Sequence, residues 1–389
     1  MKGDPKKILF LTPHFYPEPI STGKFNTELA LALQKQEHEI SVLCYHPLYP
    51  EWQIQPSEEQ LEGIRIKRMG RSVKFPNNQF LRRLVLEVSF ALNTTLHIRK
   101  IAKRVDYVLP IFPPSLAFFL IKSFLPRKTK TVGIIHDLQQ IYSQQKTGLM
   151  HKIVSSIINT VERKCYKSCN RLIFLSCEMK DKASELYRLR EEKTLVQYPF
   201  ITLNEKFEIG TIKVLDPNKI NITYSGALGE KQNPVQLYEF FNYASDKLEN
   251  VEFHIFSKGN IFSQLKEMNT NAKIKFHELV PKNDLGALYK QSEVQIVPQK
   301  EGTSMGSLPS KLPNLLISGV KTLLITDPGS ELYHFYKNNG LSEVATSWDY
   351  SVLLKALEKI IKLEIDVNSQ KAVANEFFTI DKMIDKILE

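Results

Sequence analysis

The 389-residue sequence is poor in cysteine and contains no arginine after residue 190. Its cysteines form no CxxC pair and have no histidine pair beside them, so neither a disulfide framework nor a metal site is indicated. Reduced thiols are typical of a cytoplasmic protein. Any phosphate bound by the second half must be met by lysines and backbone N–H groups, because that half has no guanidinium group. The cysteines are Cys44, Cys165, Cys169 and Cys177.

Long apolar runs are also missing. No uninterrupted apolar segment reaches the roughly 18 residues that a transmembrane helix needs. Residues 1–7 lead into the strand-like run 8–11 without the pattern of a signal peptide, so any membrane contact is expected to be peripheral. No GxGxxG motif follows this run, which argues against an NAD-dependent enzyme.

Positive charge is concentrated in the first half of the chain. Residues 1–200 contain 31 lysines and arginines against 18 acidic residues, whereas the remainder contains 21 against 24. The cations are not interleaved with aromatic residues as in RNA- or DNA-binding motifs, so no nucleic-acid partner is expected. The basic amphipathic pattern 79–104, and the apolar run 116–125 before the basic segment 126–130, suit either an anionic membrane surface or a core-packing helix. With the charge asymmetry, we expect the membrane surface.

Short β-rich runs alternate with helical patterns along both halves, which is typical of doubly wound parallel sheets. The expected fold class is therefore α/β, with two Rossmann-like domains facing a cleft that binds the ligands. The predicted domains cover residues 1–203 and 204–372, and a final helix covers 373–389. The expected strands cover residues 7–12, 39–45, 65–68, 107–111, 130–136, 171–176, 220–224, 252–256, 273–276, 294–297 and 321–326.

Two lysine-bearing segments follow strand-like runs in the second half. Residues 225–233 form a glycine-bearing turn that contains Lys231. Residues 309–312 open an apolar helix, so Ser310 is expected to cap that helix and Lys311 to meet a phosphate in its first turn. Phosphates bind where strands end and helices begin in such sheets. The two lysines together predict a site for one diphosphate.

Two positions in the first half also lie at expected strand ends. Gly23 and Lys24 follow the first strand and open a helix, where a residue without Cβ lets the backbone approach a donor phosphate or an acceptor. His136 and Asp137 follow the run 130–135. A carboxylate within reach of an acceptor hydroxyl can orient or deprotonate it, so Asp137, more than His136, is the candidate for this role. A His-Asp pair is otherwise as often a structural cap.

Short motifs are distributed over nearly the whole chain. They are YPEP at 16–19, TGKF at 22–25, YPEW at 49–52, YSG at 224–226, GEKQ at 229–232, LPSKL at 308–312 and SG at 318–319. With these motifs the sequence resembles the family 4 glycosyltransferases of the GT-B fold. It is similar in particular to the branch that includes colanic-acid fucosyltransferase-like and O-antigen aminosugar transferases. Each motif is weak alone, but several in the same order are fairly specific.

The resemblance implies transfer of a sugar from a nucleotide diphosphate, UDP or GDP, to a lipid-linked saccharide in the biosynthesis of O-antigen, capsule or exopolysaccharide. It implies retention of anomeric configuration, no metal and no cofactor, since lysines and helix N-termini can stabilise the leaving diphosphate. The first domain would bind the acceptor at the inner face of the cytoplasmic membrane, and the second the nucleotide sugar. Residues 373–389 would cross back to the first domain.

The resemblance also implies a set of site residues. Lys231 and Lys311 would stabilise the leaving diphosphate, helped by Ser310 and nearby backbone N–H groups. The nucleotide base of the donor is expected to bind main-chain groups near Leu279 and Val280. The expected catalytic residues are Asp137, His136, Lys231 and Lys311. The expected donor-binding residues are Gly23, Lys24, Gly226, Glu230, Lys231, Leu279, Val280, Gly306, Ser307, Ser310, Lys311 and Asn314.

Three positions depart from the family pattern. Ala227 stands where an arginine often follows the first glycine of the donor loop. Leu308 lies seven residues after Glu301, where a second glutamate is common. Asn314 replaces the glutamate that usually binds the ribose, and an amide binds a hydroxyl more weakly than a carboxylate does.

Two alternatives therefore stay open. A nucleotide-sugar 2-epimerase has the same two-domain architecture but uses no acceptor, and a donor-only assay would reveal its product. A catalytically inactive scaffold of polysaccharide assembly is compatible with Ala227 and Asn314, although both lysines are present. The basic, apolar first domain favours a transferase with a lipid-linked acceptor, because an epimerase needs no membrane face.

Overall fold

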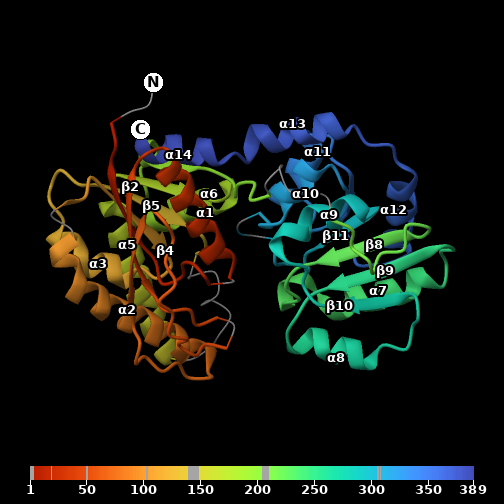
Figure 1. Cartoon of the computed structure of the whole chain (residues 1–389), viewed down its shortest axis with the longest axis horizontal. Coiled ribbons are helices and arrows are strands. Elements are labelled where there is room, and N and C mark those ends of the chain that lie inside the picture. The colour runs from red at the N-terminus through yellow and green to blue at the C-terminus, as the bar shows by residue number, and fades with distance from the viewer. Residues whose placement is uncertain are drawn as a thin grey trace. The chain divides into compact units, whose positions relative to one another are not determined.

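The computed structural model describes residues 4–18, 20–49, 51–101, 104–138, 149–203, 210–304, 306 and 308–389. The chain forms two compact units (Figure 1). Unit 1 contains Met1–Pro199 and Ile380–Glu389, and unit 2 contains Phe200–Thr379. The division falls after Pro199 rather than after residue 203, because the N–H of Ile201 donates to the carbonyl of Phe378 at 2.8 Å and so ties this segment to unit 2.

Unit 1 is built on a seven-stranded sheet with the order β3-β2-β1-β4-β5-β6-β7, in which the paired strands are parallel. The strands are β1 (Lys7–Leu11), β2 (Glu39–Tyr45), β3 (Ile64–Met69), β4 (Tyr107–Phe112), β5 (Lys130–Ile135), β6 (Arg171–Phe174) and β7 (Thr194–Val196). The helices are α1 (Ser21–Lys35), α2 (Gln79–Ile101), α3 (Leu116–Ile121), η2 (Lys122–Phe124), α5 (Leu149–Ser168), α6 (Cys177–Tyr187), η3 (Glu191–Lys193) and α14 (Ile380–Leu388).

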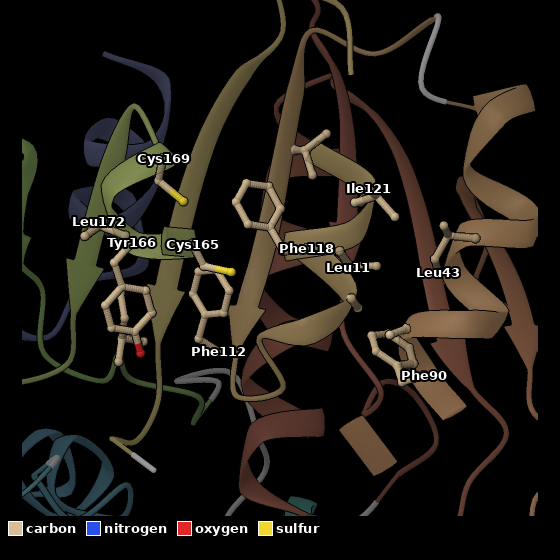
Figure 2. Packing of buried hydrophobic residues seen from close by; sticks show 14 of the residues in the cluster. Leu11, Leu43, Phe90, Phe112, Phe118, Ile121, Cys165, Tyr166, Cys169 and Leu172 are labelled. Carbon is tan, nitrogen blue, oxygen red and sulfur yellow. The ribbon is translucent and has the colours of Figure 1, made fainter. Parts of the chain in front are cut away.

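The core of unit 1 joins its sheet to α2, α3 and α5 (Figure 2). Phe112 of β4 lies 5.8 Å from Phe118 of α3 and 5.2 Å from Tyr166 of α5, measured between ring centroids. Cys165 and Cys169 are buried thiols in the same core. Tight packing of this kind fixes the strand ends that carry the polar residues described below.

The last helix belongs to unit 1. In α14 the ammonium of Lys386 donates to the carbonyl of Val196 at 2.8 Å, and the Leu388 carbonyl accepts from the Tyr107 hydroxyl at 2.9 Å. The predicted single helix 373–389 is instead two helices, because the chain leaves the helical conformation at Phe378 and begins a new helix at Ile380.

Unit 2 repeats the plan with a six-stranded parallel sheet of order β10-β9-β8-β11-β12-β13. The strands are β8 (Ile220–Ser225), β9 (Val251–Phe256), β10 (Ile274–His277), β11 (Val294–Pro298), β12 (Lys321–Ile325) and β13 (Glu343–Ala345). The helices are η4 (Glu230–Gln232), α7 (Pro234–Ser245), α8 (Asn260–Met268), η5 (Lys282–Asp284), α9 (Leu285–Gln291), α10 (Leu312–Ser318), α11 (Glu331–Asn338), α12 (Tyr350–Lys362) and α13 (Val367–Phe377).

The predicted α/β class with doubly wound parallel sheets is confirmed. Two strands were missed, β7 and β13, and each is only three residues long at the edge of its sheet. Short edge strands carry little periodic signal, because alternation needs more positions to be visible. Within the described part of the chain, no helix is both long enough and apolar enough to cross a membrane.

Candidate active site

The strand order of unit 2 places β8 next to β11, with the chain continuing to β9 on one side and to β12 on the other. Open α/β sheets bind ligands at such a switch point, beyond the carboxyl ends of the strands. The two lysine-bearing loops predicted from the sequence leave these two strands. A backbone hydrogen bond joins the loops, from the N–H of Lys300 to the carbonyl of Lys231 at 2.7 Å.

Lys311 places its ammonium at this switch point. Its Nζ donates to the carbonyl of Ile296 at 3.0 Å and to that of Ser225 at 3.3 Å. The same atom lies 4.4 Å from the centroid of the Tyr224 ring. Burial lowers the pKa of Lys311 to about 7. The ammonium is thus held by carbonyl dipoles and one aromatic face, and a bound diphosphate would favour its charged form.

The helix starts beside both lysines differ from the prediction. No side chain caps α10, and Ser310 is exposed, so the predicted Ser310 cap is wrong. Lys311 itself is the N-cap residue, because the helix begins only at Leu312. Lys231 lies in the 3₁₀ turn η4 before α7, and both Lys231 and Glu230 are exposed.

Two glycines give the donor loops their shape. Gly226 has a φ of +135° and Gly306 has a φ of +138°, which side-chain-bearing residues rarely adopt. A Cβ on Gly306 would meet no atom within 4 Å, so this position requires glycine for its backbone conformation and not for packing. Ser307 lies outside the described residues.

Asp327, which follows β12, holds the loop after β11 and was not singled out from the sequence. Its carboxylate accepts from the N–H of Gly302 at 3.0 Å and from the hydroxyl of Ser304 at 2.6 Å. The signal in the sequence was the Asp-Pro-Gly turn that ends at Gly329. Bonds to a charged acceptor are strong, so Asp327 preorganises the loop that leads to Gly306.

Asn314 has a different contact from the one expected. Its side chain is 6% exposed, and Oδ1 accepts from the N–H groups of Thr202 at 2.8 Å and Leu203 at 3.1 Å. Its Nδ2 donates to the hydroxyl of Thr202 at 2.9 Å. The predicted ribose contact does not fit this arrangement, because the buried amide already holds the segment that enters unit 2.

The residues expected near the nucleotide base lie beyond β10, an edge strand separated from β8 by β9. Leu279 is exposed and Val280 is half-buried. Their part in binding a base stays a prediction.

In unit 1, His136 follows β5 and turns an unused ring nitrogen inward. Its ring meets that of Phe25 edge-on at 4.7 Å. Within the described part of the chain, its buried Nε2 has no hydrogen-bond partner. Burial, with a smaller contribution from His14, lowers the pKa of His136 to about 3. A neutral imidazole with a spare nitrogen can donate or accept a hydrogen bond at a substrate hydroxyl.

His14, which the sequence reasoning missed, is a second buried imidazole beyond β1. Its Nδ1 is 4.0 Å from a carboxylate oxygen of Glu18, and burial lowers the pKa of His14 to about 4. The Asn26 amide donates to the His14 carbonyl at 3.1 Å and so fixes its backbone. A histidine in the loop after the first strand was the available signal.

Glu18 is a buried carboxylate in the loop after β1 that also contains His14. It accepts from the N–H groups of Tyr49 at 2.6 Å and Leu48 at 3.1 Å, and burial raises the pKa of Glu18 to about 7. A Cβ on Gly23 would lie 3.0 Å from Cβ of Glu18. Gly23 lies inside α1 and is buried, so it allows helix and loop to approach, and the expected phosphate approach is not supported. Lys24 is exposed.

Beside Glu18 the loops after β1 and β2 enclose a hollow of about 560 Å³. Its lining combines carboxylates, an amide, a phenol and prolines, which is the chemistry that binds saccharide hydroxyls and ring faces. The lining residues are Pro17, Pro47, Tyr49, Glu51, Gln55, Pro56, Ser57, Glu58 and Glu59.

Asp137 is half-buried, and its carboxylate accepts from the N–H of Leu138 at 3.0 Å, as a local cap does. Its role towards an acceptor stays a prediction. Among the described residues, no group of three or more histidine, cysteine, aspartate or glutamate side chains is arranged to hold a metal ion.

Residues 22–205 match the family described as Glycosyltransferase Family 4. The chain is a glycosyltransferase, and residues 22–205 are similar to family 4. This glycosyltransferase is 25% identical, over 358 residues, to WcaI of Escherichia coli (strain K12), assigned as a colanic acid biosynthesis glycosyl transferase. The match covers 84% of each of the two proteins.

Solved structures share the fold of this glycosyltransferase. Sucrose-phosphate synthase from Thermosynechococcus elongatus superposes with a TM-score of 0.73 at 12% identity, covering 98% of both chains. WaaG, a glycosyltransferase involved in lipopolysaccharide biosynthesis, superposes with a TM-score of 0.67 at 13% identity, covering 98% of this chain and 99% of WaaG. The GT-B fold is therefore confirmed.

Proposed function

We propose that this glycosyltransferase moves a sugar from a UDP- or GDP-linked donor to a lipid-linked saccharide in cell-surface polysaccharide biosynthesis. The single observation that supports donor binding is the position of the Lys311 ammonium between Ser225, at the end of β8, and Ile296, within β11. Support for the pathway comes from the relatives, of which WcaI is assigned to colanic acid and WaaG to lipopolysaccharide biosynthesis.

In the proposed mechanism, unit 2 binds the diphosphate and stabilises the charge that develops as it leaves. Lys311 provides a cation that the fold already holds at the switch point, and its loop is joined to the Lys231 loop. Groups oriented before the reaction need no reorganisation as charge develops, which makes such stabilisation a large term in catalysis. The proposal assigns this role to lysine and backbone N–H groups, without a metal or cofactor.

Unit 1 is proposed to bind the acceptor. The polar hollow beside Glu18 offers carboxylates and prolines to a saccharide, while His136 and His14 offer neutral imidazoles. A neutral imidazole can orient a hydroxyl, and the charge of Asp137 would favour proton removal. Retention of configuration is proposed from the family resemblance, and NMR analysis of the product anomer tests it.

A membrane contact is proposed through α2. Five exposed apolar side chains recur along it at helical spacing, which suits the interface of an anionic bilayer when cations flank them. Arg82 and Arg83 lie in the same helix. The exposed side chains are Leu81, Leu84, Val88, Leu92 and Leu96.

The test is thermal unfolding of the protein with UDP, GDP, CDP or dTDP. A ligand that binds the native state must raise the unfolding temperature. We expect one nucleotide to do so for the wild type and for Lys290→Ala, an exposed lysine on α9, but not for Lys311→Ala. No shift with any nucleotide would contradict the donor site.

Incubation with the matching nucleotide sugar then separates the enzyme classes. A transferase needs a saccharide acceptor to consume the donor, whereas a 2-epimerase converts it alone. An epimerised sugar without acceptor would overturn the proposal.

A further inference from the structure

A second hollow in unit 1, of about 460 Å³, lies between η2 and α5. One lysine from η2 and three cations from the last turns of α5 line it, together with two hydroxyl residues. The lining residues are Lys122, Thr160, Arg163, Lys164, Lys167 and Ser168. We call this set the basic hollow.

The basic hollow is remote from the candidate active site of unit 1. Lys122 lies in the connection that leads into β5, and Ser168 ends the helix that leads into β6, so both lie near the amino ends of these strands. His14 and His136 follow the carboxyl ends of β1 and β5. All these strands are parallel, so the two sites lie at opposite edges of one sheet.

The charge of the basic hollow is not balanced locally. Within the described part of the chain, no ion pair joins its four cations to an acidic side chain. Glu162, on the same turn of α5, is buried and accepts from the Tyr187 hydroxyl at 2.6 Å, so it points into the core. By contrast, Lys182 and Arg190 elsewhere in unit 1 each have a carboxylate within 4.0 Å.

The cations are also gathered by packing. The ammonium of Lys122 is 5.0 Å and that of Lys164 is 5.8 Å from the centroid of the same Phe119 ring. The same ring therefore attracts both ammonium groups, which repel each other. An anion between them would relieve that repulsion, and a hollow lined by one sign of charge focuses the field on it.

We infer that the basic hollow binds a phosphate group. Ammonium and guanidinium groups are donors only, and the oxygens of a phosphate are acceptors that match them. The hydroxyls of Thr160 and Ser168 already donate to backbone carbonyls at 2.8 Å, so the cations supply the donors for the ligand.

The expected source of this phosphate is an anionic lipid headgroup. Ile157 lies one turn before Thr160 on α5 and is 58% exposed, and Phe124 of η2 is 40% exposed. Apolar side chains beside a phosphate site can enter the acyl boundary while the cations contact headgroups. In this form the inference deepens the proposed membrane contact and rests on it.

The test compares Lys164→Gln/Lys167→Gln with the control Lys182→Gln/Arg190→Gln, which removes equal charge from exposed positions elsewhere in unit 1. Binding of full-length protein to phosphatidylglycerol and phosphatidylcholine vesicles is measured at about 0.1 M salt, where the Debye length is about 10 Å. Lys164→Arg/Lys167→Arg keeps the charge and checks that folding is intact.

We expect the hollow variant to bind phosphatidylglycerol roughly 30-fold more weakly, because each interfacial cation contributes to the attraction. The control should change binding less than threefold, and the arginine variant should bind like the wild type. Equal losses in the hollow variant and the control would overturn the inference, since the attraction would then depend on net charge alone.

Isothermal titration with pyrophosphate separates the two sources of phosphate, and it is made with Lys311→Ala present in every variant so that the proposed donor site does not contribute. If the wild type bound no vesicles, the proposed membrane contact would fail; pyrophosphate binding lost in the hollow variant but kept in the control would then assign the site to a free phosphate. Absence of binding to both vesicles and pyrophosphate would overturn the phosphate site.

Discussion

The two units place different chemistry at the same edge of similar sheets. At the carboxyl ends of its strands, unit 1 buries His14, His136 and Glu18, whose pKa values burial shifts to about 4, 3 and 7. Unit 2 places the ammonium of Lys311 there, between two backbone carbonyls. The net charges do not follow this local chemistry. The imidazoles belong to the strongly basic half, residues 1–200, and the lysine belongs to the slightly acidic remainder.

This difference teaches that net charge does not identify a phosphate site in this molecule. The acidic half can bind a diphosphate because the fold holds one lysine at the switch point. Backbone N–H groups nearby can also donate hydrogen bonds to the phosphate oxygens. The basic half keeps uncharged imidazoles at that edge, and four of its cations gather at the opposite edge of the sheet. Position within the sheet therefore decides which ligand each edge can take.

The largest expected effect is on the donor side. Lys311→Met should reduce the rate of sugar transfer by about 10²–10³-fold, because the leaving diphosphate loses a preorganised cation. Initial rates at saturating donor measure this, with Lys290→Met as the matched control on the exposed surface of unit 2. A loss of less than fivefold would remove Lys311 from the mechanism.

On the acceptor side, His136→Ala should lower the transfer rate about 100-fold, because the acceptor hydroxyl would lose the imidazole that orients it. The thermal shift caused by the nucleotide should stay unchanged, because His136 belongs to unit 1. The exposed His334 provides the control His334→Ala. If the nucleotide no longer raised the unfolding temperature of the His136 variant, the assignment of nucleotide binding to unit 2 would be wrong.

The two units are proposed to bind different ligands, but acidic pH should destabilise both of them. In unit 2, His254 contacts His277 at 3.1 Å, and burial lowers their pKa values to about 3 and 4. A lowered folded-state pKa means that the unfolded chain takes up protons first, so stability is present above pH 6.5 and is lost as pH falls towards 4.

The same sign holds for His14 and His136 of unit 1, whereas the raised pKa of Glu18 acts in the opposite direction. Between pH 7.5 and pH 5 each of these four histidines should cost about 2 kcal/mol and Glu18 should offset about 2, so we expect a net loss of roughly 6 kcal/mol in the free energy of unfolding. Urea unfolding at the two pH values measures it. An equal or higher urea midpoint at pH 5 would contradict the expectation.

The smallest expected effect concerns the donor loop. Asp327→Ala should weaken nucleotide binding about tenfold, because the loop loses its charged acceptor without losing Lys311. Isothermal titration measures the affinity, and the control is Asp246→Ala, at the exposed C-cap of α7. Unchanged affinity would show that the loop keeps its shape without Asp327.

Local patterns in the sequence predicted the doubly wound sheets and the strand ends that carry Lys231, Lys311 and His136. These patterns depend on periodicity and turn residues within a few positions, which a single sequence displays directly. The turn that contains Gly226 was predicted in the same way, and the φ of +135° at Gly226 fits a turn glycine.

Only the tertiary structure decided which partner each polar group meets. Asn314 holds Thr202 across 112 residues of chain, and Ser304 bonds to Asp327, which lies in the loop after the next strand. Lys122 and Lys164 of the basic hollow come from different elements and both approach the Phe119 ring of α3. Such contacts depend on how elements distant in sequence are packed, so residue spacing alone carries no record of them.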